Sequence, residues 1–145
     1  MNKHLLLALT LCVSLHGYGQ KMHQLVSPNG NIQVSINISD KIYYDIVCQK
    51  DTSLKQCNLQ MQLGDQEAGN HPKLIKANRK SINESLKPII ALKHSTVSNK
   101  YNQLQLKFKG DYSVEFRAFD DGIAYRFITN KKGMIEVGNE IFQVN

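Results

Sequence analysis

The residues best suited to chemistry are two adjacent acidic residues, Asp120 and Asp121, in the segment EFRAFDDGIAYRF at residues 115–127. Two carboxylates beside aromatic side chains are compatible with a catalytic pair, a metal-binding loop or a hairpin turn. Glycoside hydrolysis needs carboxyl groups that face each other about 5–5.5 Å or 6.5–9.5 Å apart, whereas neighbours on a turn generally point apart. A calcium loop needs several more oxygen ligands at regular spacing. The favoured interpretation is therefore a turn, in which Gly122 takes the position that needs unusual backbone angles.

No other motif for catalysis or metal binding is present in the sequence. It has no Gly-x-Ser-x-Gly element, no phosphate-binding loop and no His-Glu-x-x-His motif. Its histidines and cysteines do not follow the spacing of a zinc site. The sequence therefore predicts no catalytic residue, no bound cofactor and no metal site.

A weaker alternative is a sugar-binding surface built on aromatic rings, which pair well with the apolar faces of sugars. Tyr43 and Tyr101 lie on the strand faces opposite their apolar neighbours, so both are candidates for an exposed platform. Other tyrosines are better explained by packing in the core or across strands: Tyr44, Tyr112 and Tyr125.

Cys48 and Cys57 are separated by eight residues. Export would permit a disulfide between them, which would close a short hairpin-like loop. Cysteine also behaves as a small hydrophobic residue, so two free thiols are an equal alternative.

The first 19 residues have the layout of a secretory signal peptide. Lys3 and His4 precede an apolar run at residues 5–15, and Gly17 and Gly19 lie at positions −3 and −1 of a cleavage site before Gln20. The run is too short to cross a bilayer, which takes about 20 apolar residues. We expect an exported protein, periplasmic or secreted, whose mature chain has no membrane span.

The chain of 145 residues has a formal net charge of +6. Its basic residues are dispersed, with no tight cluster and no nucleic-acid motif, which is typical of a solvated surface. We therefore expect no nucleic-acid partner.

Apolar residues alternate with polar ones along much of the chain, which is the pattern of antiparallel strands with one buried face. The runs lie at residues 32–38, 42–48, 59–63, 104–108, 112–118 and 123–127. Gly110 and Asp111 predict a two-residue hairpin loop. The pattern predicts an all-β antiparallel sandwich.

The remaining segments have weaker signals. Residues 64–88 have little periodicity and many turn-forming residues, which predicts a long connection with short strands near 74–75 and 89–92. A short strand pair is expected at 135–137 and 141–144, separated by Gly138 and Asn139.

Several segments in order resemble the start of glycoside hydrolase family 97, the exported α-glucosidases and α-galactosidases of Bacteroidetes. The segments are LVSPNGNIQVSI, LKQCNLQMQLGD, SINESLKPI, FRAFDDGIAYRF and VGNEIFQVN. The strongest match contains a signature for which the resemblance implies a structural role: Phe116, Arg117, Asp120, Asp121, Gly122, Tyr125, Arg126 and Phe127. Cys57 departs from the small polar residue expected there, so the cysteine pair need not be a family feature.

The resemblance implies that residues 20–145 form about the first half of the family's N-terminal β-sandwich, a supersandwich related to galactose mutarotase. In such enzymes a following (β/α)₈ barrel carries catalysis, and calcium lies near the active site. On this reading the chain is an incomplete sandwich that is not an enzyme on its own and has no cofactor itself. Its expected partner is the missing barrel or an α-linked oligosaccharide. The alternative is a stand-alone exported carbohydrate-binding module.

Overall fold

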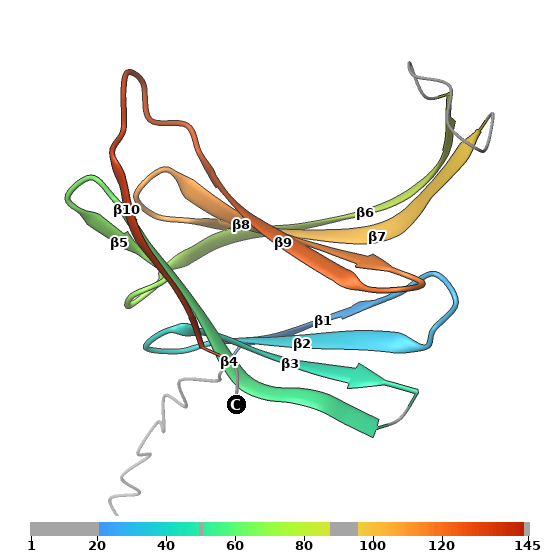
Figure 1. Cartoon of the computed structure of the whole chain (residues 1–145). Coiled ribbons are helices and arrows are strands. Elements are labelled where there is room, and N and C mark those ends of the chain that lie inside the picture. Colours follow the sequence, from blue (N-terminus) through green and yellow to red (C-terminus); the bar gives the residue numbers. More distant parts are fainter. Residues whose placement is uncertain (1–20, 50, 88–95, 144–145) are drawn as a thin grey trace, which may run out of the picture.

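The computed structural model describes residues 21–49, 51–87 and 96–143 (Figure 1). The expected signal peptide lies outside these residues. The strands are β1 Lys21–Val26, β2 Ile32–Ile38, β3 Ile42–Cys48, β4 Asp51–Leu63, β5 Gln66–Ala68, β6 Leu74–Leu86, β7 Val97–Phe108, β8 Tyr112–Phe119, β9 Ile123–Thr129 and β10 Val137–Gln143. No helix occurs in the described residues, so none there is long and apolar enough to cross a membrane.

The strands form two antiparallel sheets stacked face to face (Figure 1). Sheet I has the order β1-β2-β3-β4-β10, with β5 paired to β4 off this path, and sheet II has the order β6-β7-β8-β9. Figure 1 shows sheet II lying over sheet I, with the distal ends of β6 and β7 curving away from it. The predicted all-β antiparallel sandwich is confirmed.

The core lies between the sheets and is built from the alternating apolar residues. Val34 and Ile36 of β2 point inward and are fully buried, as are Val114 and Phe116 of β8. Because successive side chains of a strand point to opposite faces, one apolar residue in every two suffices to cover each sheet's inner face. The alternation in sequence is the direct cause of the layered fold.

The prediction of a long connection at residues 64–88 is wrong, because this segment contains β5 and the 13-residue strand β6. The strand expected near 74–75 is confirmed, as the start of β6. β6 pairs only with β7 and forms an edge of sheet II. Most of its residues are exposed on both faces, so no alternating apolar pattern is required of it. The strand expected at 89–92 lies outside the described residues.

Two other local predictions are also wrong. The pair expected at 135–137 and 141–144 is a single described strand, β10, which pairs with β4 and has an irregular register between Val137 and Glu140. The loop between β7 and β8 has three residues, because Phe108 pairs with Tyr112. Gly110 and Asp111 do have positive φ angles, 98° and 58°.

Side chains of sheet II close the free edge of β1. The Arg79 guanidinium donates a hydrogen bond to the Gln24 carbonyl, and Asn102 Nδ2 donates to the Val26 carbonyl at 2.8 Å. These bonds satisfy carbonyls that point away from β2. They also occupy an edge that could otherwise pair with another strand.

Candidate functional site

Asp120 and Asp121 lie in the turn between β8 and β9, as predicted. Ala118 pairs with Ile123, and the Phe119 N–H donates to the Gly122 carbonyl at 2.8 Å. The Asp120 carboxylate, however, reaches the other sheet, where its Oδ1 accepts a hydrogen bond from the Asn29 backbone N–H at 2.8 Å. Asp120 therefore joins the two sheets as well as forming the turn.

The loop that Asp120 contacts is the SPNGN segment between β1 and β2, residues 27–31. Asn29 Oδ1 accepts hydrogen bonds from the Ser27 hydroxyl at 2.8 Å and from the Asn31 N–H at 2.9 Å. The Ser27 hydroxyl in turn accepts from the Ile32 N–H at 3.0 Å. These side-chain bonds to nearby backbone fix the loop, so that the Asn29 N–H points toward Asp120. Two segments on which the family resemblance depends, LVSPNGNIQVSI and FRAFDDGIAYRF, are thus in direct contact.

The predicted backbone role of Gly122 is wrong. Its φ angle does not lie in the left-handed region, and a Cβ atom added there would meet nothing within 4 Å. The turn closes with an ordinary conformation at this position.

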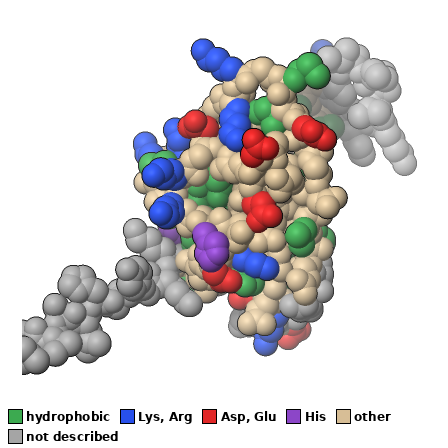
Figure 2. All heavy atoms as spheres, turned by 90° about the vertical axis from the view of Figure 1, so that its left-hand side faces the viewer, with side chains coloured by type: hydrophobic (Ala, Val, Ile, Leu, Met, Phe, Trp, Pro, Cys, Tyr) green, Lys and Arg blue, Asp and Glu red, His purple; other side chains and the backbone are tan. Residues whose placement is uncertain are grey.

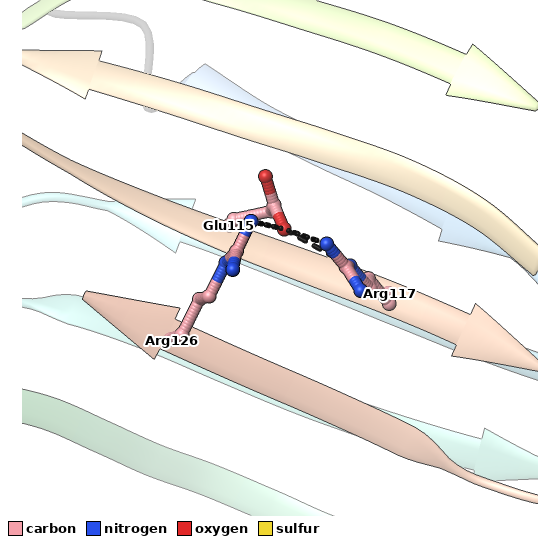
Figure 3. Close-up of polar contacts among 3 residues, drawn as sticks. All are labelled: Glu115, Arg117 and Arg126. Atoms are coloured by element: carbon pink, nitrogen blue, oxygen red, sulfur yellow. Dashed lines mark hydrogen bonds and ion pairs between the residues drawn. The ribbon is translucent and has the colours of Figure 1, made fainter. Parts of the chain in front are cut away.

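A charged cluster forms on the outer face of sheet II (Figure 3). Glu115 of β8 is only 3% exposed. Its Oε1 accepts from Arg117 Nε at 2.9 Å, and Arg117 Nη2 lies 2.8 Å from the same oxygen. Arg126 Nη2 of β9 is 2.9 Å from that oxygen too. Figure 3 shows the two guanidinium groups converging on the carboxylate from neighbouring strands.

Strand register explains how these three residues meet. Glu115 and Arg117 are two residues apart on β8 and so share a face. Arg126 is the direct cross-strand partner of Glu115, and opposite charges at such positions attract. One buried carboxylate neutralises one of the two arginine charges, which leaves this cluster with a net positive charge.

Tyr101 does not form an exposed platform, and this prediction is wrong. The side chain does lie on the outer face of sheet II, but it is only 7% exposed. The Arg117 guanidinium lies over its ring, 4.8 Å from the centroid, and Phe119 packs beside it at 4.9 Å between ring centroids. The stem and head of an arginine can cover an aromatic ring in this way.

Tyr43 is half-buried on the outer face of sheet I, where its hydroxyl donates to Asp40 Oδ2 at 3.5 Å. Tyr101 belongs to the outer face of sheet II, and the outer faces of the two sheets point away from each other. The two tyrosines therefore cannot form one sugar-binding platform.

Cys48 and Cys57 are free thiols, and no disulfide joins them. Cys48 lies opposite Asp51, while Cys57 lies opposite Tyr44, four residues away along β3. That separation is roughly 13 Å at the usual rise of a strand, and a disulfide requires Cα atoms about 4.4–6.8 Å apart. Of the two alternatives, the structure has the free thiols.

The described residues do not fit a calcium ion. In the described part of the chain, no three His, Cys, Asp or Glu side chains lie close enough to hold a metal. At the turn, Asp120 is already bonded to Asn29. No step that involves calcium is therefore assigned to these residues.

Comparison with known proteins identifies the fold's relatives. Residues 25–145 match the sequence model of the family Glycosyl-hydrolase 97 N-terminal. The chain belongs to this family. The resemblance drawn from the sequence motifs is therefore confirmed.

Relatives of this family 97 N-terminal chain include a retaining alpha-galactosidase of Bacteroides thetaiotaomicron, 38% identical over 142 residues. The match covers 97% of this chain and 21% of that protein. A family 97 enzyme of Pseudoalteromonas sp. strain K8, solved in complex with panose, has a TM-score of 0.71 at 25% identity over 83% of this chain and 20% of its own. A beta-arabinopyranosidase shares the fold, with a TM-score of 0.72 at 20% identity. The chain thus spans about a fifth of the length of these relatives.

The other signature residues lie in the sandwich around the turn. Phe116 is fully buried, and Phe127 packs against the core. Tyr125 contacts Phe116 at 6.3 Å between ring centroids, and its hydroxyl donates to Glu140 at 2.8 Å. Burial and the Glu140 carboxylate raise the pKa of Tyr125 to about 12.

Sequence reasoning missed two residues of this region, Glu115 and Asn29. A signal for Glu115 was present: the alternation of β8 places it on the face of Arg117, and the DDG turn sets the register that brings Arg126 opposite. Asn29 had no comparable signal, because its contact with Asp120 depends on how the two sheets stack.

Proposed function

We propose that this chain is the N-terminal β-sandwich part of an exported α-glycosidase of family 97, and that it supports a catalytic domain without hydrolysing glycosides itself. The observation that carries the proposal is the family match over residues 25–145 combined with coverage of only a fifth of relatives that include an alpha-galactosidase. Most of the relatives' length is therefore available for a catalytic part. The partner would be that part, and the substrate class would be α-linked glycosides.

The rim of the sandwich supports this role. The Tyr125 ring of β9 stacks on the Phe142 ring of β10 at 6.0 Å, yet Phe142 remains 50% exposed and Val137 60% exposed. These side chains form a partly exposed apolar edge where β9 and β10 meet, which we call the β9–β10 rim. Figure 2 looks onto the side where β10 and β5 lie, and apolar side chains are visible there among charges of both signs. Exposed apolar groups rimmed by polar ones are typical of an interaction surface.

The test is an assay of the folded chain alone against an aryl α-galactoside and an aryl α-glucoside, each with and without calcium. The proposal predicts no turnover in any of the four conditions. Hydrolysis that a single carboxylate substitution abolishes would contradict it, because the catalysis would then belong to this sandwich.

No observation favours a stand-alone carbohydrate-binding module. Of its two candidate platforms, Tyr101 is covered by Arg117 and Tyr43 faces the opposite side of the molecule. Only the supporting role is therefore proposed.

A further inference from the structure

Three outward-facing residues of sheet II are buried, although no layer lies above that face in the described residues. Ser113, Glu115 and Tyr101 point outward by strand alternation, and each is at most 7% exposed. Arg117 lies over the Tyr101 ring, and Arg117 and Arg126 both contact Glu115. A polar group is seldom buried unless it is paired. The buried Glu115 carboxylate is paired with Arg117 and Arg126, and this pairing holds both arginine side chains in place.

The two arginine side chains are held in place, but some of their N–H groups have no acceptor within the described residues. Arg117 is held in place because its Nε and Nη2 both contact Glu115 Oε1 and its guanidinium lies over the Tyr101 ring. Arg126 contributes Nη2 to the same oxygen, and its side chain is 57% exposed. Within the described residues neither guanidinium has a further acceptor for its remaining N–H groups. A second carboxylate would balance the net charge and accept these donors.

A small hollow lies beside the arginines. It has a volume of about 90 Å³ and is lined by Glu115, Arg117, Ala124, Tyr125 and Arg126. Ala124 is the cross-strand partner of Arg117, and its short side chain leaves the space open. Ligand pockets usually measure about 300–1,000 Å³, so this hollow is too small for a sugar ring and suits the end of one acidic side chain.

The surrounding face favours an acidic partner. Lys76, Lys80 and Lys107 lie on the same face by register, and all three are exposed. Arginine and tyrosine are also the residue types that dominate binding energy at protein interfaces, and side chains already locked in place lose little entropy on binding.

We propose that the outer face of sheet II, centred on Arg117 and Arg126, is a docking surface for an acidic protein segment, one carboxylate of which enters the hollow at Ala124. This surface adjoins the β9–β10 rim at Tyr125, which lines the hollow and also stacks on Phe142. It does not depend on the glycosidase proposal, and either can fail without the other.

The proposal is tested by titrating the ¹⁵N-labelled chain with a hexaglutamate peptide while the side-chain Nε–H signals of Arg117 and Arg126 are followed by NMR. We expect both signals to shift saturably, and we expect Arg126→Gln to weaken binding about tenfold. The matched control is Lys55→Gln, which removes an exposed positive charge from β4 of the other sheet. It should leave binding within about twofold. Because Arg126 is largely exposed, its variant is expected to fold.

Three outcomes would overturn the proposal. One is a folded chain whose arginine signals do not respond to the peptide. Another is equal weakening by Arg126→Gln and Lys55→Gln, which would indicate attraction by net charge alone. The third is saturation by inorganic phosphate as tight as that by hexaglutamate, which would indicate a small-anion site.

Discussion

At the residue scale, the two neighbouring aspartates of the β8–β9 turn have different surroundings. Asp120 accepts a hydrogen bond from the loop of the opposite sheet, whereas Asp121 has no side-chain partner in the described part of the chain. Adjacent residues of a turn point apart, so one can serve the fold while the other faces solvent. The acidic pair is explained by this division without catalysis.

Asp120→Ala should lower the free energy of unfolding by about 0.5–1 kcal/mol, because the bond to Asn29 is lost at an exposed position. Asp120→Asn keeps an oxygen acceptor and should recover most of the loss. Asp121→Ala is the matched control and should change stability by less than about 0.5 kcal/mol. The measurement is urea unfolding of all three variants, and equal effects of the two alanine substitutions would contradict the role of Asp120.

Glu115→Ala should cost about 1–3 kcal/mol, because it leaves two guanidinium groups without the carboxylate that they share. Arg126→Ala should cost less than Glu115→Ala, since Arg126 is largely exposed and exposed ion pairs contribute little. Thermal unfolding of both variants gives the comparison. If Arg126→Ala lowers stability as much as Glu115→Ala, the expectation that water screens the exposed Arg126–Glu115 ion pair is contradicted.

Two glycines provide a further contrast. Gly69 has a φ angle of +92°, and a Cβ atom there would lie 2.3 Å from the Leu59 carbonyl oxygen. Gly69→Ala should therefore destabilise the sandwich by at least about 2 kcal/mol. Gly122→Ala meets no atom and needs no unusual φ, so it should be neutral or stabilising by up to about 1 kcal/mol. Denaturant midpoints of the two variants give the comparison. A Gly122→Ala variant less stable than Gly69→Ala would contradict the positive φ angle and the close Leu59 contact at Gly69.

At the scale of strands, the sequence predicted those elements whose inner face is apolar and whose outer face is polar. The alternation of β2 and β8 is visible in the sequence because the apolar core selects every second residue. β6 was missed because an edge strand exposed on both faces places no such demand on its residues. The Glu115 cluster and the Asp120–Asn29 bond were missed for another reason. Both depend on pairing or stacking between segments, which composition along one segment does not encode.

Tyr125 contacts β10 through Glu140 and Phe142, and its raised pKa gives a pH prediction. The pKa of Tyr125 is raised from 10.0 to about 12 in the folded chain, so the folded state holds a proton that the unfolded state releases above pH 10. The stability that this group contributes is complete below pH 10 and is lost as the pH rises to about 12. Unfolding free energies should fall over that window.

The variant Tyr125→Phe separates the pH-dependent stability contributed by Tyr125 from that contributed by other buried tyrosines. Burial also raises the pKa of Tyr44 and Tyr112, so some decline should persist in the variant. The variant should be less stable near neutral pH, having lost the bond to Glu140, and its decline above pH 10 should be shallower. An identical pH slope in the two proteins would exclude Tyr125 as a contributor.

At the scale of the whole molecule, the two sides of the sandwich differ. On the β1 side, Arg79 and Asn102 donate hydrogen bonds to outward carbonyls of β1 and line a hollow of about 370 Å³. The β9–β10 rim exposes the apolar side chains of Phe142 and Val137. This difference fits the proposal that the rim packs against another part of a longer protein.

The supporting role is tested most directly by the alpha-galactosidase activity of a chimera. Residues 20–145 of this chain would replace the corresponding fifth of the Bacteroides thetaiotaomicron enzyme, to which the chain is 38% identical. We predict that the chimera hydrolyses an aryl α-galactoside, and that Phe142→Asp at the rim lowers this activity at least about tenfold while Lys55→Gln does not. A folded chimera without activity, or one that tolerates Phe142→Asp, would contradict the supporting role proposed for this sandwich.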